Sequence, residues 1–181
     1  MKAKEYETPV SGDHRNSDLA SELCAKAAKL IKQDQLPAAE RELKMALTAD
    51  AFFGPAHNNL GMVYYQQQKY YLAAWEFQYA AKLMPTKAEP KNNLGMVFEA
   101  VGRRDEAARN FEEALALDDD CVDAITNLAS IYVRQNRKDE KTRALLNDIV
   151  LKDTRPEWTD WARQQLALMG PARSATTKAA E

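Results

Sequence analysis

The stretch Gly54–Pro85 reads GPAHNNLGMVYYQQQKYYLAAWEFQYAAKLMP, and its pattern returns at a fixed distance along the chain. The tetrapeptide NNLG at Asn58–Gly61 recurs at Asn92–Gly95, and a weaker copy, TNLA, follows at Thr126–Ala129 after a step of the same length. Self-similarity at one constant period is the sequence signature of a repeat architecture. We therefore predict that the chain is built from stacked units of equal length, each as long as the step from Asn58 to Asn92.

Within a unit the apolar residues have helical spacing and form two facing stripes. With Gly54 as position 1, Leu60 and Tyr64 stand at positions 7 and 11 and share one face of a first helix. A second helix carries its stripe at positions 20, 24 and 27, and small residues at positions 8 and 20 let the two helices approach closely. Proline at position 32 cannot continue a helix and ends the second one. The second unit has Leu60, Gly61, Tyr64, Ala73, Phe77, Ala80 and Pro85 at these positions.

This arrangement of large and small residues resembles the consensus of the tetratricopeptide repeat (TPR) family. The next unit matches six of the seven positions, and Asp119 replaces the proline. The register continues into both flanking units with departures: Lys26 at position 7 of the first, and Lys141 and Asp148 at positions 20 and 27 of the fourth. The resemblance implies an all-α, right-handed superhelical solenoid of about four helix-turn-helix units with a C-terminal capping helix.

The register also predicts the boundaries of the domain. We expect a disordered N-terminal lead at residues 1–17, a TPR domain at residues 18–170 and a disordered tail at residues 171–181. The predicted units are residues 20–53, 54–87, 88–121 and 122–155, and residues 156–170 form the helix that covers the open end of the solenoid.

The turn inside each unit is predicted from position 15, which is Asp34, Gln68, Gly102 and Asn136 in the four units. Glycine, asparagine and aspartate tolerate the left-handed backbone that such a turn favours, and Gln68 is the exception.

Composition limits the class of protein. The chain has 181 residues, of which 45% are hydrophobic and 29% charged, as in an ordinary globular domain. No apolar run is long enough for a membrane helix, and residues 1–20 lack the apolar core of a signal peptide. We expect a cytoplasmic protein that does not insert into membranes, unless a native signal or anchor is missing from this sequence. The net charge of −2 without a basic face argues against nucleic acid as a partner, and Cys24 and Cys121 are expected as free thiols.

No motif of catalysis or cofactor binding stands out. The sequence contains no GxxxxGK[ST], GxGxxG, HExxH or CxxC. His14 lies in the lead, and His57 is expected as a partly buried helix residue. The run Asp118–Asp120 is expected to be solvated or to cap the next helix, since three successive acids on a helix cannot face one point. We therefore expect no enzyme activity, no metal and no cofactor.

The resemblance implies that a ligand groove is lined by the first helix of each unit. Asparagine stands at position 6 three times, and a row of amides suits the main chain of an extended peptide, although asparagine is also common at this position of the family. The family's carboxylate clamp needs basic residues that are absent here, so binding of an EEVD-type terminus is not expected. The predicted groove residues are Asn58, Asn59, Met62, Tyr65, Asn92, Asn93, Met96, Asn127 and Arg134.

A second candidate surface does not come from the family pattern. Tyr71, Trp75 and Tyr79 are spaced i, i+4, i+8 on the second helix of the second unit, at positions that normally face solvent on the convex side. An exposed aromatic row marks a contact surface, whereas rings lying over neighbouring helices would be ordinary packing. Both interpretations stay open at this point.

The predicted function is a non-enzymatic protein–protein interaction or scaffold module that binds a peptide or helix of a partner protein in its concave groove. Two alternatives remain: a self-associating assembly factor that forms a homo-oligomer through the convex aromatic row, and a regulatory or substrate-recruiting fragment of a larger enzyme.

Overall fold

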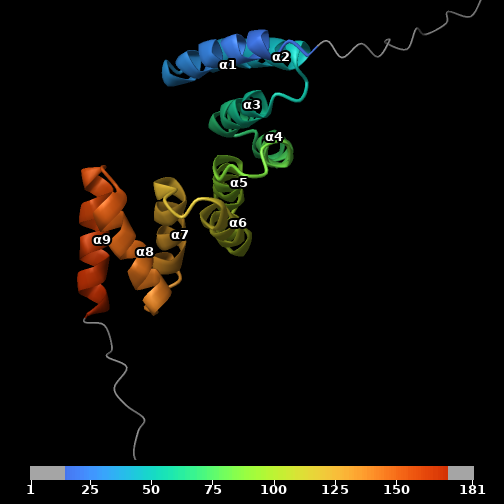
Figure 1. Ribbon diagram of the computed structural model, residues 1–181. Coiled ribbons are helices and arrows are strands. Elements are labelled where there is room, and N and C mark those ends of the chain that lie inside the picture. The colour runs from blue at the N-terminus through green and yellow to red at the C-terminus, as the bar shows by residue number, and fades with distance from the viewer. Residues whose placement is uncertain (1–14, 171–181) are drawn as a thin grey trace, which may run out of the picture.

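The computed structural model describes residues 15–170, and within this range the chain is entirely helical (Figure 1). The predictions for residues 1–14 and 171–181 lie outside the described residues. The all-α prediction is confirmed. The helices are α1 Ser17–Lys32, α2 Leu36–Ala49, α3 Gly54–Gln66, α4 Tyr70–Leu83, α5 Glu89–Ala100, α6 Arg104–Leu117, α7 Val122–Arg134, α8 Glu140–Lys152 and α9 Pro156–Met169.

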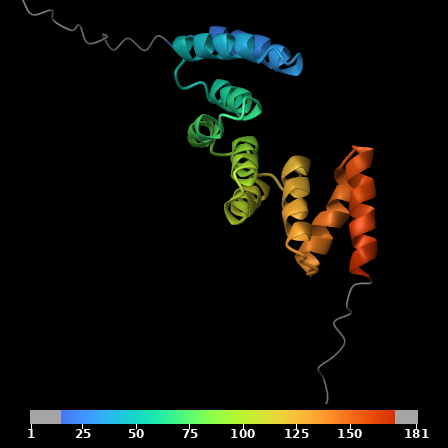
Figure 2. The same ribbon diagram turned by 180° about the vertical axis from the view of Figure 1, so that it is seen from behind.

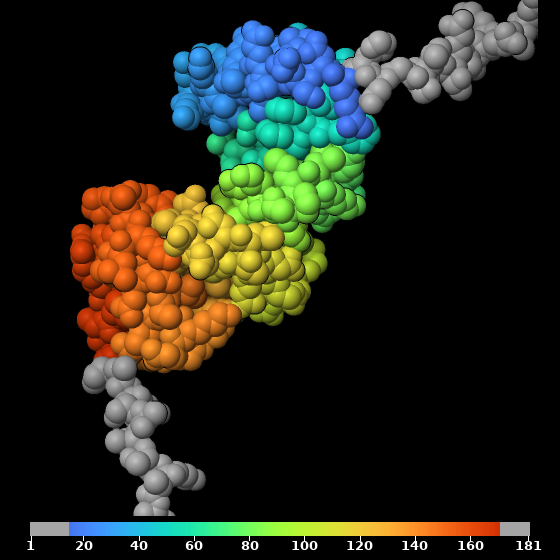
Figure 3. Space-filling model, in the orientation of Figure 1, coloured from blue at the N-terminus to red at the C-terminus, as the bar shows by residue number. Residues whose placement is uncertain are grey.

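Consecutive helices pack in pairs, and the pairs stack into a curved solenoid. Helices α3, α5 and α7 lie toward the inner side of the curve, and α4 and α6 lie on its outer side (Figures 1 and 2); α1 packs beside α3 and so continues the inner row. The space-filling view shows that the inner side is hollowed between the N-terminal and C-terminal halves (Figure 3). This shape separates an inner, groove-like face from an outer face, and the two candidate surfaces lie on these opposite faces.

The turns between paired helices adopt the predicted left-handed backbone in every unit. The φ angles are 57° at Asp34, 59° at Gln68, 81° at Gly102 and 56° at Asn136. Gln68 therefore adopts the left-handed region although its side chain gives it no special tolerance for it. After each of these residues the backbone N–H of the next residue closes on the preceding helix, as in the bond from Lys69 N to Tyr64 O at 2.8 Å.

The predicted stripes form the core. In the first three units the residues at positions 20, 24 and 27 are all buried, and in the second and third the glycine at position 8 lies against the phenylalanine at position 24. A Cβ added to Gly95 would come within 2.5 Å of the Phe111 ring, so glycine is what lets these two helices approach. The buried sets are Ala39, Leu43 and Ala46, then Ala73, Phe77 and Ala80, then Ala107, Phe111 and Ala114.

The fourth unit departs from the strict period. Lys141, predicted for position 20, is exposed, whereas Thr142, Leu146 and Ile149 are completely buried. These three residues have the same 4-then-3 spacing as the buried sets of the other units, shifted by one residue. The longer turn between α7 and α8 accommodates the extra residue and ends at Asp139, whose carboxylate caps α8. The two apparent departures at positions 20 and 27 therefore reflect a one-residue insertion.

The ends of the described chain are closed in different ways. Helix α1 begins with Asn16 as its cap, since the Asn16 side chain accepts a hydrogen bond from Leu19 N. At the other end α9 packs on α8, and its Trp158 and Trp161 meet edge to face with ring centroids 5.5 Å apart. Both rings pack against the buried cluster that includes α8. Helix α9 thus occupies the place predicted for a capping helix.

Candidate functional site

The inner face carries the predicted asparagines, and the structure shows that they bind one another. The Nδ2 of Asn93 donates to Oδ1 of Asn58 at 3.0 Å, and the Nδ2 of Asn127 donates to Oδ1 of Asn92 at 3.0 Å. Each bond joins position 6 of one unit to position 5 of the unit before it. The same geometry appears once more, where Asn59 Nδ2 lies 3.2 Å from the sulfur of Cys24. Repetition of the helix pair therefore produces a repeated bond between neighbouring inner helices.

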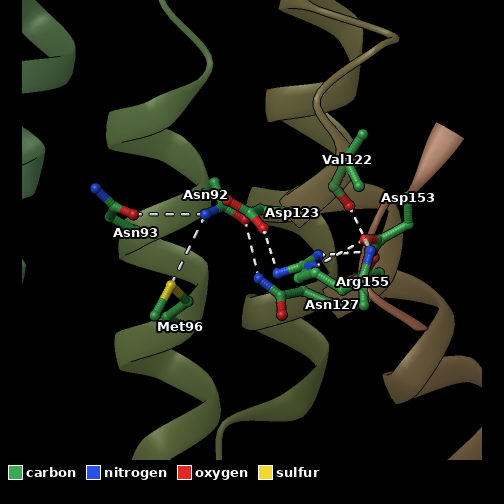
Figure 4. Close-up of polar contacts among 9 residues, drawn as sticks. Asn92, Asn93, Met96, Val122, Asp123, Asn127, Asp153 and Arg155 are labelled. Atoms are coloured by element: carbon green, nitrogen blue, oxygen red, sulfur yellow. Dashed lines mark hydrogen bonds and ion pairs between the residues drawn. The ribbon is translucent and has the colours of Figure 1, made fainter. Parts of the chain in front are cut away.

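Two of these asparagines, Asn92 and Asn93, are buried, and a hydrogen bond between them connects the two inter-helix bonds. Asn92 is 5% exposed and Asn93 is 7% exposed. The Nδ2 of Asn92 donates to Oδ1 of Asn93 at 3.4 Å and lies 3.8 Å from the sulfur of Met96 (Figure 4). The chain of amides Asn58–Asn93–Asn92–Asn127 thus links α3, α5 and α7. We call it the amide row; its buried members hold the inner helices in register.

Beside the amide row lie three half-buried apolar residues of the predicted groove: Met62, Tyr65 and Met96. The ring of Tyr65 meets that of Tyr70 edge to face at 5.7 Å, which fixes its orientation. Burial raises the pKa of the Tyr65 hydroxyl, so this group stays protonated at neutral pH. Thioether side chains adapt to differently shaped partners, and the two methionines occupy the same repeat position on two neighbouring inner helices.

Charged groups on the inner face are mostly paired with one another. Arg134, a predicted groove residue, forms an ion pair with Glu99 on the neighbouring inner helix. Arg155 lies 3.0 Å from Asp123 and 2.7 Å from Asp153, as Figure 4 shows. The hydrogen bond from Arg155 lowers the pKa of the buried Asp153 carboxyl. This face therefore presents little unpaired charge at its C-terminal end.

The outer face carries the predicted aromatic row on α4. Tyr71 is 85% exposed and Trp75 is 54% exposed, so neighbouring helices do not cover these rings. Trp75 stacks on Tyr79, with centroids 5.6 Å apart and planes inclined by 10°. We call Tyr71, Trp75 and Tyr79 the aromatic stripe. Of the two interpretations, simple packing within the monomer fits only Tyr79.

Under the stripe lies a buried pair that the sequence analysis missed. The edge of His57 meets Tyr79 at 4.6 Å, and its Nδ1 lies 2.7 Å from Oε2 of Glu76. Its Nε2 lies 3.0 Å from the carbonyl oxygen of Ala51. An imidazole flanked by two acceptors satisfies both only when both nitrogens carry protons. Burial lowers the pKa of His57, but the hydrogen bonds to Glu76 and Ala51 outweigh it, and the net pKa is raised.

Within residues 15–170, no three His, Cys, Asp or Glu side chains gather as a metal site would require. No helix in that range has the length and apolar character to span a membrane. Both cysteines are free thiols, as predicted.

The comparisons with known proteins agree with this geometry. Residues 99–161 match the sequence model of the family described as tetratricopeptide repeat. No curated protein sequence matches significantly. Among solved structures, the first TPR domain of Spaghetti (RPAP3) bound to the HSP90 peptide SRMEEVD has a TM-score of 0.64 and 22% identity, covering 70% of this chain and all of that domain.

Two further structures are similar over a larger part of this chain. PilF of Pseudomonas aeruginosa has a TM-score of 0.69 and 20% identity over 83% of this chain and 73% of its own. The O-GlcNAc transferase of Thermobaculum terrenum (mutant K341M) has a TM-score of 0.67 and 24% identity over 83% of this chain, but only 27% of the transferase. Identities at this level show the shared fold. Residues 99–161 match the repeat's own sequence model, and the same kind of helix pair recurs along the described chain, so the fold is that of a tetratricopeptide-repeat solenoid.

Proposed function

We propose that this protein is a non-enzymatic interaction module whose inner face binds an extended segment of a partner protein. The observation that carries the proposal is the amide row, which fixes the inner helices beside the half-buried Met62, Tyr65 and Met96. A binding surface held on rigid helices loses little conformational entropy when a ligand binds.

The chemistry of the inner face favours a segment that contributes apolar side chains. Met62 and Met96 offer adaptable apolar contacts, and Asn127 and Asn59 each retain one amide N–H and the carbonyl oxygen for a peptide main chain. The pairing of Arg134 with Glu99 removes a cation that could attract an acidic ligand.

The domain of RPAP3 in the comparison binds the peptide SRMEEVD, which ends in acidic residues. The matching positions of this chain offer no cationic clamp: Cys24 is buried and already faces Asn59, and Glu89 and Asp123 stand where lysine would be needed. We therefore expect this groove to select a different kind of segment from a chaperone C-terminus.

Substitution of the two methionines tests the groove. The variant Met62→Arg/Met96→Arg places two cations on the inner face, and we expect it to lose roughly tenfold or more of the affinity for a groove ligand. Binding partners are captured from cell extract with the wild type and with the variant, and each protein is quantified by mass spectrometry. Partners depleted by the groove variant are then measured as purified proteins.

Met45→Arg is the control, because it makes the same substitution at a methionine on the outer helix α2, where Met45 is 55% exposed. It should capture the same partners as the wild type. If every partner binds the groove variant as well as it binds the wild type, or if Met45→Arg removes the same partners, the groove is not the binding site.

A further inference from the structure

The aromatic stripe is an apolar surface without cover among the described residues. Tyr71 and Trp75 are mostly exposed, and Leu72 beside them is 44% exposed. Together the rings leave on the order of 300 Å² of aromatic surface in contact with solvent. A patch of this size equals the largest apolar patch of a typical monomer, and such patches are often functional. The stripe is therefore a candidate docking surface, and its surroundings indicate what docks on it.

The unpaired charges around the stripe are mostly positive. Arg41 on α2 and Arg109 on α6 occupy the same repeat position as Trp75, one unit to either side, and Lys82 follows on α4. Within residues 15–170 these three exposed cations form no ion pair, whereas Glu40 pairs with Lys44, Glu113 with Lys91 and Glu76 with His57. Asp105 on α6, at the repeat position of Tyr71, is an exposed carboxylate that accepts a hydrogen bond from the Gln135 amide.

This charge distribution argues against a second copy of the chain as the occupant. Two such faces would bring like charges together. The exposed aromatic area is also well below the roughly 800 Å² per partner that a stable dimer buries. The surface instead suits a short segment that combines aromatic or proline rings with carboxylates.

The chain enters its first helix next to the stripe. The guanidinium of Arg15 lies over the ring of Phe52 at 4.6 Å. The residue before Phe52 is Ala51, whose carbonyl binds His57, and His57 contacts Tyr79. The N-terminal end of the described chain is therefore connected to the Tyr79 end of the stripe through a short series of direct contacts.

We propose that the chain's own segment Glu5–Val10, EYETPV, docks on the aromatic stripe. Tyr6 is the only aromatic residue in residues 1–14, and Pro9 follows three residues later. In the docked segment these two rings lie against the stripe, and Glu5 and Glu7 face the cations on either side. From Arg15 back to Tyr6 an extended chain reaches about 30 Å, and helix α4 is only about 21 Å long.

A weak contact is sufficient for this arrangement. A segment tethered by a short linker has an effective concentration of about 1 mM, so a segment whose own Kd is about 1 mM covers the stripe about half of the time. Docking of a partner on the stripe would then compete with the chain's own N-terminal segment. This inference does not depend on the inner groove, and either can fail without the other.

The indole N–H signals in a ¹⁵N–¹H NMR spectrum test the proposal, with the Trp75 signal assigned through Trp75→Phe. We expect Tyr6→Ala/Pro9→Ala to shift the Trp75 signal and to leave those of Trp158 and Trp161 in place. Adding a synthetic peptide of residues 1–14 to the double variant should return the Trp75 signal toward its position in the wild type, with a Kd on the order of 1 mM.

Ser11→Ala is the matched control, since it changes the same N-terminal stretch outside Glu5–Val10, and it should leave the Trp75 signal unchanged. The proposal is overturned if the Trp75 signal of Tyr6→Ala/Pro9→Ala coincides with that of the wild type. It is also overturned if the shift appears only as the protein concentration rises, because the occupant is then a second copy.

Discussion

Gly61 lies directly against the ring of Phe77: a Cβ on Gly61 would come 2.7 Å from two carbon atoms of that ring. The Phe77 side chain is 1% exposed and has little room to move away. The size of the residue on the inner helix and that of the residue on the outer helix are therefore coupled. The corresponding buried residues are Ala27 and Leu43 in the first unit and Ala129 and Leu146 in the fourth, a larger inner residue with a smaller outer one.

This relationship predicts that Gly61→Ala destabilises the protein by about 1–3 kcal/mol, the usual effect of overpacking a core. The better helix propensity of alanine is worth only about 1 kcal/mol and does not offset a clash with a buried ring. The free energy of unfolding in urea measures the effect.

A second substitution separates the clash from other causes. Gly61→Ala/Phe77→Leu recreates the alanine–leucine pair of the first and fourth units, and we expect it to be more stable than the sum of the two single effects by about 0.5–3 kcal/mol. Strictly additive effects would show that the two residues are not coupled.

Gln68 offers a stabilising change. Its φ of 59° is costly for a residue with a β-carbon, and the third unit has Gly102 at the same place in the turn. We expect Gln68→Gly to stabilise the fold by about 0.5–1 kcal/mol and to raise the Tm by about 1–4 °C. Gln66→Gly, at the last residue of α3, introduces glycine where the backbone is helical; it is the control and should lower the Tm. A fall in Tm for both variants would contradict the inference that the backbone at Gln68 is strained.

Much of the fold could be predicted because it depends on local spacing that repeats. The turn at Gln68 was placed from the period alone. The register of α8 could not be obtained from a fixed period, since one inserted residue moved burial from Lys141 to Thr142. A search for the 4-then-3 spacing of the core, independent of the period, would have found it.

The candidate site was predicted less completely, because its contacts join different helices. The sequence placed Asn93 and Asn127 on the inner face but could not show that each binds an asparagine of the preceding unit, Asn58 and Asn92 respectively. That pairing depends on how neighbouring inner helices lie side by side. The contact of His57 with Glu76 likewise depends on the rotation of α3 against α4.

The N-cap of α8 should show a dependence on acid. Asp139 Oδ1 accepts hydrogen bonds of 2.8 Å from both the N–H and the hydroxyl of Thr142, and the backbone bond lowers the pKa of Asp139 to about 2. Asp139→Ala should lower the free energy of unfolding at pH 7 by about 0.5–2 kcal/mol. Because the folded pKa lies below the unfolded value, this stabilisation is present above about pH 4 and is lost as the pH falls toward 2.

Unfolding in urea at several pH values between 7 and 2 checks this: the difference between wild type and Asp139→Ala should shrink over that range. Asp105→Ala removes an exposed carboxylate from the first turn of α6, where no side chain caps the helix, and is the control. An Asp139→Ala deficit that stays constant down to pH 2 would rule out the ionised cap.

His57 should give the opposite dependence, at higher pH. The pKa of His57 is raised in the folded protein. The charged ring therefore contributes fully to the free energy of unfolding below the pKa of the unfolded chain, near 6.5, and this contribution is lost as the pH rises through the folded pKa. A neutral ring has one N–H, so either the hydrogen bond to Glu76 or the one to Ala51 is then lost. Loss of one hydrogen bond should lower the free energy of unfolding by about 0.5–1.5 kcal/mol. Burial raises the pKa of Cys24 and of Cys121, so neither thiol ionises over most of this window.

The measurement compares the free energy of unfolding at pH 6 and at pH 8.5 for the wild type and for His57→Gln, whose side chain does not titrate. We expect the wild type to lose stability over this interval and His57→Gln to be nearly constant. His14→Gln removes the other histidine and should behave as the wild type. If the wild type and His57→Gln change in parallel, the ring is neutral at pH 6 and one of its two acceptors is unsatisfied, and the buried pair beneath the aromatic stripe is not an ion pair.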